Sequence, residues 1–353
     1  MSLENIKLHG RDVKPHKATC RADFGGRTVL TNSPWEYVSL WLQRSNIPGA
    51  EAAAFYWTQA RAFALAAQGL PQESAPLPLY YSFMNAAKAL LVTRGMVLQE
   101  FHGVTKHRSS ERREKIDLNN EGVRILERGI LPMLSRCLEE SEGETVYSLK
   151  DLLFNLPCIH RTFCITYDQQ AELLIPLTNC RYVFDSPTGS AYLSAQISSD
   201  FDYQAFVDRL PVELEKDPMT ADARSLRSVK SAKIESAVLS SASDIQKIGE
   251  LNKLLRPDLQ YIAGSTTLWY AKAMPRHGEK RIRRSPLTIS LAAMHRLSEL
   301  SRYSPMQLSD LFKGEQNWLL SEFIQMSPQQ FTDEIAAEIT GHQCMTPNVR
   351  PAS

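Results

Sequence analysis

Apolar side chains recur at helical spacing in two stretches of the chain, one around residue 85 and the other around residue 295. Steps of three and four residues place such side chains on one face of a helix. The apolar positions are Tyr80, Phe83, Met84, Ala87 and Leu91 in the first stretch and Leu287, Leu291, Met294, Leu297 and Leu300 in the second. Each stretch is therefore predicted to form a helix with one buried face.

Ser-Pro dipeptides beginning at residues 33, 285, 304 and 327 predict four helix starts. A serine hydroxyl can accept a hydrogen bond from a free amide of the first turn. Proline fits that turn because its missing N–H would have no partner there. At the first of these positions Glu36 follows Ser33 by three residues, which is the spacing of a capping box.

Between residues 158 and 235 the pattern changes to short runs rich in β-branched and aromatic residues. The runs RTFCITYD, AELLIPL, RYVFD and SAYLSAQIS are separated by turn sequences such as DSPTG. Such runs are typical of strands. They predict a small antiparallel sheet, followed by a helix over 241–255 with Ser243 as its cap and by a strand over 265–273.

These patterns together predict an α+β protein that is predominantly helical, with a small antiparallel β region between two helical regions. The expected ranges are 1–157 (helical), 158–273 (mixed β/α) and 274–353 (helical). The two periodic helices lie on opposite sides of the β region, and both carry polar rows that need partners when buried. We therefore expect the ranges to pack as one unit, with residues 80–103 next to residues 291–303.

The composition is that of a folded globular protein, with 43% hydrophobic and 22% charged residues. A net charge of +1 excludes a strong overall attraction to nucleic acid, so any surface of that kind must be a local patch. The chain contains no apolar run of about 18 residues, so no membrane span is predicted. The six cysteines lack disulfide-like spacing, which favours a reduced cytoplasmic protein.

The first periodic helix carries a polar row beside its apolar face, formed by Tyr81, Asn85 and Lys88. A phenol, an amide and an ammonium in one row can bind a phosphate or a polar partner; the alternative is a polar face bonded to a neighbouring segment. Beyond the helix, His102 precedes Gly103. This pair suits a sharp turn that presents an imidazole for acid–base work.

Two further residues near this turn are candidates for the same site. Arg94 precedes the turn and His107 follows it. A histidine here can move a proton near neutral pH. The alternative is a structural histidine that bonds a loop carbonyl.

The second periodic helix carries its own polar row, His295, Glu299 and Arg302. Glu299 can orient His295 or pair with Arg302, since these residues are four and three positions apart. The row is either an acid–base pair or a buried network that locks the helix in place.

Loop 275–285 is the strongest local basic patch, and Arg281, Arg283 and Arg284 are its candidate phosphate contacts. The alternative is a solvated charged loop. Cys158, His160, Cys164 and Cys180 lack the paired spacing of zinc sites, so no metal is predicted. No glycine-rich phosphate loop, G-x-S-x-G or H-E-x-x-H motif occurs, and no cofactor is predicted.

The blocks YYSFMNAAKALL, FHG and LAAMHRLSELSRYSP resemble the bacterial YaaC-like family, and the first is also similar to the helical HEPN superfamily. HEPN proteins are often dimers associated with RNA and with toxin or phage-defence systems. Active HEPN ribonucleases carry Arg, four to six residues, then His. Here Arg94 and His102 are separated by seven residues, and the literal match from Arg11 to His16 contains Pro15.

The resemblance implies a cytoplasmic, HEPN-like protein that acts on or with RNA, in phage defence, and that forms a homodimer. The candidate catalytic residues are His102, Arg94, His295 and Glu299. The candidate binding residues are Tyr81, Asn85, Lys88, His107, Arg281, Arg283, Arg284 and Arg302. A non-catalytic scaffold that binds a protein partner is one alternative, and a metabolic enzyme with an unrecognised site is another.

Overall fold

The computed structural model describes residues 3–108, 117–168, 170–200 and 206–347. The chain forms two compact units, each assembled from segments that are distant in sequence. Unit 1 comprises residues 1–32, 172–279 and 341–353, and unit 2 comprises residues 33–171 and 280–340. No helix in the described part of the chain is both long enough and apolar enough to cross a bilayer.

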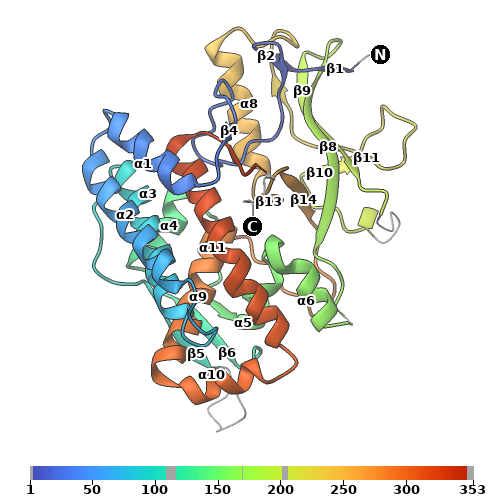
Figure 1. Ribbon diagram of the computed structural model, residues 1–353. Coiled ribbons are helices and arrows are strands. Elements are labelled where there is room, and N and C mark those ends of the chain that lie inside the picture. Colours follow the sequence, from blue (N-terminus) through green and yellow to red (C-terminus); the bar gives the residue numbers. More distant parts are fainter. Residues whose placement is uncertain (1–2, 109–116, 169, 201–205, 348–353) are drawn as a thin grey trace. The chain divides into compact units, whose positions relative to one another are not determined.

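Unit 2 contains most of the helices (Figure 1). Its described helices are α1 (Pro34–Arg44), α2 (Ala50–Ala67), α3 (Pro76–Thr93), α4 (Ile130–Cys137), α5 (Leu149–Phe154), the 3-10 turn η1 (Pro157–Ile159), α6 (His160–Thr166), α9 (Pro286–Tyr303), α10 (Pro305–Phe312) and α11 (Asn317–Thr340). Strands β5 (Val104–Arg108), β6 (Glu121–Ile125) and β7 (Val146–Ser148) form an antiparallel sheet beside them.

Helix α3 lies inside unit 2 and packs against α2, α9 and α11. All five apolar positions predicted on α3 are buried, and so are the five predicted on α9. The ring of Phe83 stacks on Phe331 of α11, with centroids 4.1 Å apart. The prediction of two helices with buried faces is therefore confirmed.

Three of the four predicted Ser-Pro helix starts are confirmed, at α1, α9 and α10. The fourth is wrong, because α11 continues through Pro328. The missing N–H of Pro328 costs one backbone hydrogen bond. The flanking Ile324 and Phe331 are buried, so packing holds the helix together across this position. The cap of helix α8 is also corrected: it is Ser241, not Ser243.

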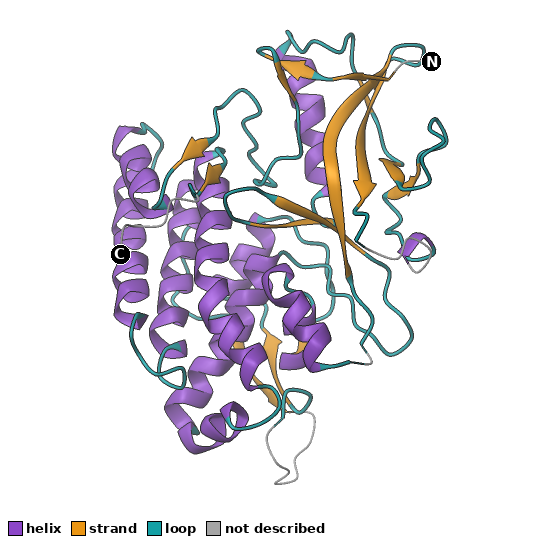
Figure 2. Cartoon of the chain, turned by 45° about the vertical axis from the view of Figure 1, so that its right-hand side comes forward, coloured by secondary structure: helices purple, strands orange, loops and turns teal. Residues whose placement is uncertain are grey.

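Unit 1 is built around an antiparallel sheet that Figure 2 shows as long, bent strands. Its strands follow the order β10-β11-β9-β8-β14-β13, with β1 added beside β8 and β12 beside β9. The bounds are β1 (Leu3–Asn5), β8 (Leu174–Asp185), β9 (Ser190–Ile197), β10 (Leu214–Lys216), β11 (Ser225–Ser228), β12 (Ala232–Lys233), β13 (Leu259–Ile262) and β14 (Leu268–Lys272). A bulge between Thr178 and Arg181 interrupts the β8–β9 register, and bulges of this kind bend a strand.

Helix α8 (Ala242–Leu255) covers one face of this sheet. Its Ile248, Leu251 and Leu255 belong to the same buried cluster as Tyr182 and Leu193 of the sheet. Two small ladders complete unit 1. They pair β2 (Lys7–Leu8) with β3 (Arg11–Asp12), and β4 (Val29–Leu30) with β15 (Cys344–Met345) in parallel.

The prediction of a predominantly helical chain with a small β region is wrong. The fold is α+β, and within the described residues eight strands join one antiparallel sheet. The antiparallel pairing itself is confirmed. The sheet is larger than expected because it recruits residues 3–5 and 259–262 from outside the strand-like runs.

The run RTFCITYD was expected to form a strand, but its residues 161–166 lie in helix α6. Pro157 starts the preceding turn η1, and the chain continues directly into the helix. The buried ring of Phe163 contacts Phe154 of α5, with centroids 5.1 Å apart. Burial of one helical face against neighbouring helices thus outweighs the β propensity of this run.

Candidate functional site

The two polar blocks singled out in the sequence meet in unit 2 at a cluster of Tyr80, His102 and His295, called here the Tyr–His cluster. The Tyr80 hydroxyl and His102 Nδ1 are 2.6 Å apart. The His295 ring lies 5.0 Å from the Tyr80 ring and 5.9 Å from the His102 ring, centroid to centroid. The prediction that residues 80–103 lie next to residues 291–303 is confirmed.

A glycine turn holds His102 in the cluster. Gly103 has φ +78°, and a Cβ there would lie 2.3 Å from Cδ of Pro132. The carbonyl of His102 accepts a hydrogen bond from the Leu131 amide, at 3.1 Å, which ties the turn to the start of α4. The imidazole of His102 is left exposed, while Tyr80 is buried.

The surroundings of the Tyr80–His102 pair keep both groups neutral near neutral pH. Burial raises the pKa of the Tyr80 phenol above its ordinary value. Partial burial, together with the positive charges of Lys88 and Arg302, lowers the pKa of His102, and the carboxylate of Glu299 opposes that shift. The site therefore combines a neutral imidazole with two nearby cations.

The hydrogen bond links the tautomer of His102 to the role of Tyr80. A phenol can donate a hydrogen bond or accept one. When the Tyr80 phenol donates to Nδ1, the neutral ring carries its proton on Nε2. Nε2–H is then the free donor that the exposed ring offers to a ligand.

His295 lies beneath this pair and is 6% exposed. Burial lowers its pKa to about 3, helped by the proximity of His102 and Arg296. Its Nδ1 lies 3.7 Å from Oε2 of Glu299, which is too long for a hydrogen bond. Within the described residues this nitrogen has no hydrogen-bond partner.

Glu299 is bound mainly by a different residue, Arg296, whose Nη1 lies 3.1 Å from Oε2. Arg296 also donates from Nε to the buried carboxylate of Glu121, at 3.0 Å, and Glu121 pairs with Arg108 of β5. This chain of ion pairs ties α9 to the small sheet. The geometry supports the buried-network alternative for Glu299 more directly than an acid–base pair with His295.

The three residues of the polar row on α3 make three separate contacts. Tyr81 stacks on Phe63 of α2 with centroids 5.3 Å apart, and Asn85 donates to the Tyr81 carbonyl in its own helix at 2.8 Å. The Lys88 ammonium lies over the Tyr56 ring, 5.4 Å from its centroid. Of this row, Lys88 helps to lower the pKa of His102, and Tyr81 helps to raise the pKa of Tyr80.

Two other candidates lie apart from His102. Arg94 caps the far end of α3, where its guanidinium donates to the Glu338 carbonyl at 2.7 Å. Arg94 follows Tyr80 by fourteen positions, which correspond to about 21 Å along a helix. His107 lies in β5 opposite Gly122.

The part of the basic loop that belongs to unit 2 is bound to an acidic segment, residues 139–144. Arg284 is 6% exposed and donates to Ser135 at 2.7 Å and to Glu140 at 3.2 Å. The Lys280 ammonium pairs with Glu144 at 2.6 Å. Because Arg284 is buried in these contacts, it is not available to a phosphate. Of the other two candidates, Arg283 has an exposed side chain and Arg281 is half-buried.

The cysteines and the histidine that carry ligand chemistry do not converge on a metal site. Cys164 Sγ lies 3.6 Å from Nε2 of His160 in unit 2, whereas Cys180 belongs to β8 of unit 1. Burial raises the pKa of the Cys158 thiol to about 12. The described residues contain no group of three or more histidine, cysteine or carboxylate side chains placed to hold a metal.

The sequence patterns did not reveal three residues of this site: Tyr80, Glu121 and Arg296. The helical spacing assigns Tyr80 to the apolar face of its helix and gives no indication of a role for its hydroxyl. A buried tyrosine hydroxyl normally finds a hydrogen-bond partner, and that rule is the signal that identifies it. For Glu121 and Arg296, no local pattern indicates that residues 175 positions apart are paired.

The buried imidazole of His295 makes the stability of the protein depend on pH. Its pKa is about 3 in the folded chain against an ordinary value of 6.5, so below pH 6.5 the unfolded chain binds a proton that the folded chain does not. Lowering the pH from 8 to 5 should therefore reduce the free energy of unfolding, and His295 should account for about 2 kcal/mol of that loss. Urea unfolding at the two pH values should show a smaller loss in His295→Gln than in the parent. An undiminished difference would contradict a buried neutral imidazole.

Comparison with known proteins gives one match. A family model described as YaaC-like Protein matches residues 35–339, which is most of the chain and includes every residue of the Tyr–His cluster. No curated protein and no solved structure matches this chain.

Proposed function

Since the chain belongs to the YaaC-like protein family, we propose its function from the geometry of its own residues: it binds the phosphate backbone of RNA at the Tyr–His cluster and donates a proton from His102 during strand cleavage. The observation that carries the proposal is the exposed His102 imidazole, held by the Tyr80 hydroxyl at 2.6 Å, whose pKa is lowered by burial and by the positive charges of Lys88 and Arg302.

A neutral imidazole that offers Nε2–H, together with an ammonium and a guanidinium, forms a set of donors suited to a phosphate group. A bound anion would favour the charged form of His102 and raise its pKa toward neutrality. The resulting imidazolium can protonate a leaving oxygen, while the Tyr80 phenol holds the ring in place.

RNA supplies its own nucleophile for this chemistry. The 2′-oxygen forms a bond to phosphorus as its proton passes to water, and the bond from phosphorus to the 5′-oxygen breaks. His102 gives its proton to the departing 5′-oxygen, and water later restores that proton. In this scheme Lys88 and Arg302 take the place that the HEPN resemblance would assign to Arg94.

The test measures binding and cleavage separately on single-stranded RNA. Removing one cation that binds a phosphate should reduce the slope of log affinity against log salt by about 0.7. The Lys88→Gln/Arg302→Gln variant should therefore show a slope smaller by about 1.4 and bind at least about tenfold more weakly. His102→Asn should bind slightly more weakly than the parent, because it loses one phosphate donor, and should no longer cleave. Arg283→Gln, the matched control, removes an exposed charge outside the cluster and should change neither measurement.

Three outcomes would overturn all or part of the proposal. Absence of salt-sensitive RNA binding by the parent protein would remove RNA as the ligand and favour a protein partner. Equal slopes for the parent and Lys88→Gln/Arg302→Gln would place the binding surface elsewhere. Binding without cleavage, identical in the parent and His102→Asn, would leave a binding protein without the proton-transfer role.

A further inference from the structure

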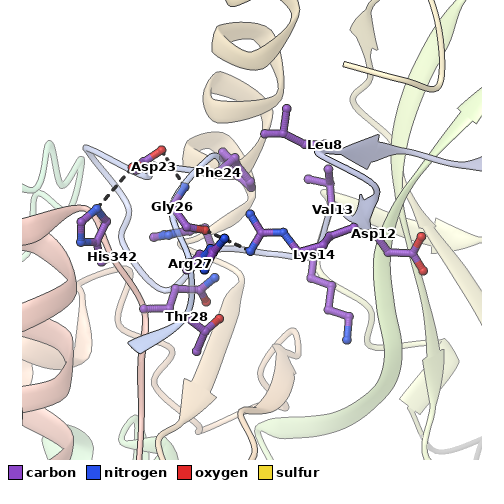
Figure 3. A pocket seen from close by; sticks show the side chains of 13 residues that line it. Leu8, Asp12, Val13, Lys14, Asp23, Phe24, Gly26, Arg27, Thr28 and His342 are labelled. Carbon is purple, nitrogen blue, oxygen red and sulfur yellow. Dashed lines mark hydrogen bonds and ion pairs between the residues drawn. The ribbon is translucent and has the colours of Figure 1, made fainter. Parts of the chain in front are cut away.

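A cavity of about 460 Å³ lies in unit 1, and all the residues that line it come from positions 8–28 and 342–343. Figure 3 shows its side chains gathered from the N-terminal segment and from the chain that follows Gly341. We call it the N-terminal pocket. Its lining residues fall outside the range that the family model matches, and none of them belongs to the Tyr–His cluster.

One wall of the N-terminal pocket is held by Asp23. Its Oδ1 accepts hydrogen bonds from the amides of Gly25 and Gly26, at 2.9 and 3.1 Å, and its Oδ2 lies 3.3 Å from Nε2 of His342. The Arg11 guanidinium donates to the carbonyls of the same two glycines. These contacts fix the glycine turn, so Asp23 and Arg11 serve the shape of the pocket.

The remaining charges of the pocket favour an anion. Its second carboxylate, Asp12, accepts a hydrogen bond from Asn5 at 3.2 Å. Lys14 and Arg27 are exposed cations that line the pocket, and within the described part of the chain neither has a hydrogen bond or an ion pair. Both carboxylates are thus engaged by the fold, whereas two cations remain open to a ligand.

The pocket also has an apolar side. Leu8 and Val13 are buried there, and the half-buried ring of Phe24 packs 5.4 Å from the His16 ring. His16 adds no charge, because burial lowers its pKa to about 3, and its Nδ1 accepts a hydrogen bond from the Ala18 amide. A ligand that matches these features has a phosphate at one end and an apolar, ring-bearing group at the other.

We propose that the N-terminal pocket binds a nucleoside monophosphate, with Lys14 and Arg27 on the phosphate and the base against Phe24, Val13 and Leu8. A cavity of this volume falls within the range of small-molecule sites, and an inorganic phosphate would leave most of it to water. The site is separate from the one proposed for RNA, and either can fail without the other.

The experiment is calorimetric titration of the full chain with AMP and UMP, alongside adenosine, ribose 5-phosphate and inorganic phosphate. AMP or UMP should bind at least tenfold more tightly than any of the three fragments. Lys14→Gln/Arg27→Gln should weaken that binding at least tenfold without lowering the melting temperature, because both side chains are exposed. The double variant Lys313→Gln/Arg283→Gln is the matched control: it removes two exposed cations outside the pocket and should bind the nucleotide like the parent.

The outcomes that would overturn the proposal are equally specific. Failure of both AMP and UMP to bind at millimolar concentration would remove the ligand class. Binding that is unchanged in Lys14→Gln/Arg27→Gln would place the nucleotide elsewhere. Inorganic phosphate or ribose 5-phosphate binding as tightly as AMP and UMP would show that the apolar side takes no part.

Discussion

Replacing Arg284 by alanine should destabilise unit 2 by about 3–5 kcal/mol. The guanidinium is buried and donates to Ser135, Glu140 and Tyr147, and to the backbone carbonyls of residues 142 and 144. Its removal leaves the buried carboxylate of Glu140 without its cation and the Glu142 carbonyl without this donor, while the Glu144 carbonyl keeps the hydrogen bond from Tyr147. Urea unfolding followed by tryptophan fluorescence measures the decrease in stability.

The neighbouring Arg283 is the matched control for this substitution. Its side chain is exposed, so Arg283→Ala should change stability by less than about 0.5 kcal/mol. Adding Glu140→Gln to Arg284→Ala should recover part of the stability, since burial already raises the pKa of Glu140 and an amide carries no charge to leave unpaired. Equal effects of the two arginine substitutions would show that Arg284 is not buried in this network.

Gly103→Ala should cost about 3 kcal/mol or more and displace His102 from the Tyr–His cluster. Two causes act together. The residue has φ +78°, which strains any side chain, and the new Cβ would lie 2.3 Å from Pro132, whose rigid ring cannot rotate away. Thermal unfolding measures the loss of stability. In the parent, adding phosphate should change the NMR signals of His102, and in Gly103→Ala this change should disappear.

Gly95 separates these two causes. It has φ +71°, and a Cβ there would meet no atom within 4 Å. Gly95→Ala therefore carries the backbone strain alone and should cost about 1–2 kcal/mol. If the two glycine variants proved equally stable, the close contact with Pro132 would not exist.

The elements that the sequence predicted correctly are those whose pattern is local and long. The apolar stripes of α3 and α9 repeat over several turns, and only a helix buries such a stripe on one face. The sheet was underestimated because several of its strands are two to four residues long, too short for an alternating pattern to emerge. The twelve residues of β8 show two strand-like runs in the sequence, because the polar residues Thr178 and Asn179 at its bulge interrupt the apolar pattern.

Residues of the candidate site could be predicted from the sequence only where a short block singles them out. His102 and His295 were found because each stands out in its own block, and packing of two apolar faces brings the blocks together. Arg284 looked like the exposed Arg283 beside it, because its burial depends on residues 135–147 from a distant part of the chain. The N-terminal pocket was missed for the same reason, since its walls join residues more than 300 positions apart.

The pairing of β4 with β15 can form only late in synthesis on the ribosome, which delays the completion of the N-terminal pocket. Residues 29 and 30 emerge early, but their partners at 344 and 345 emerge some 300 residues later. Until then the N-terminal pocket lacks the wall that His342 and Gln343 provide, whereas the Tyr–His cluster has all its residues once position 302 has been added. A nascent chain therefore carries all the residues of the Tyr–His cluster before it can close the N-terminal pocket.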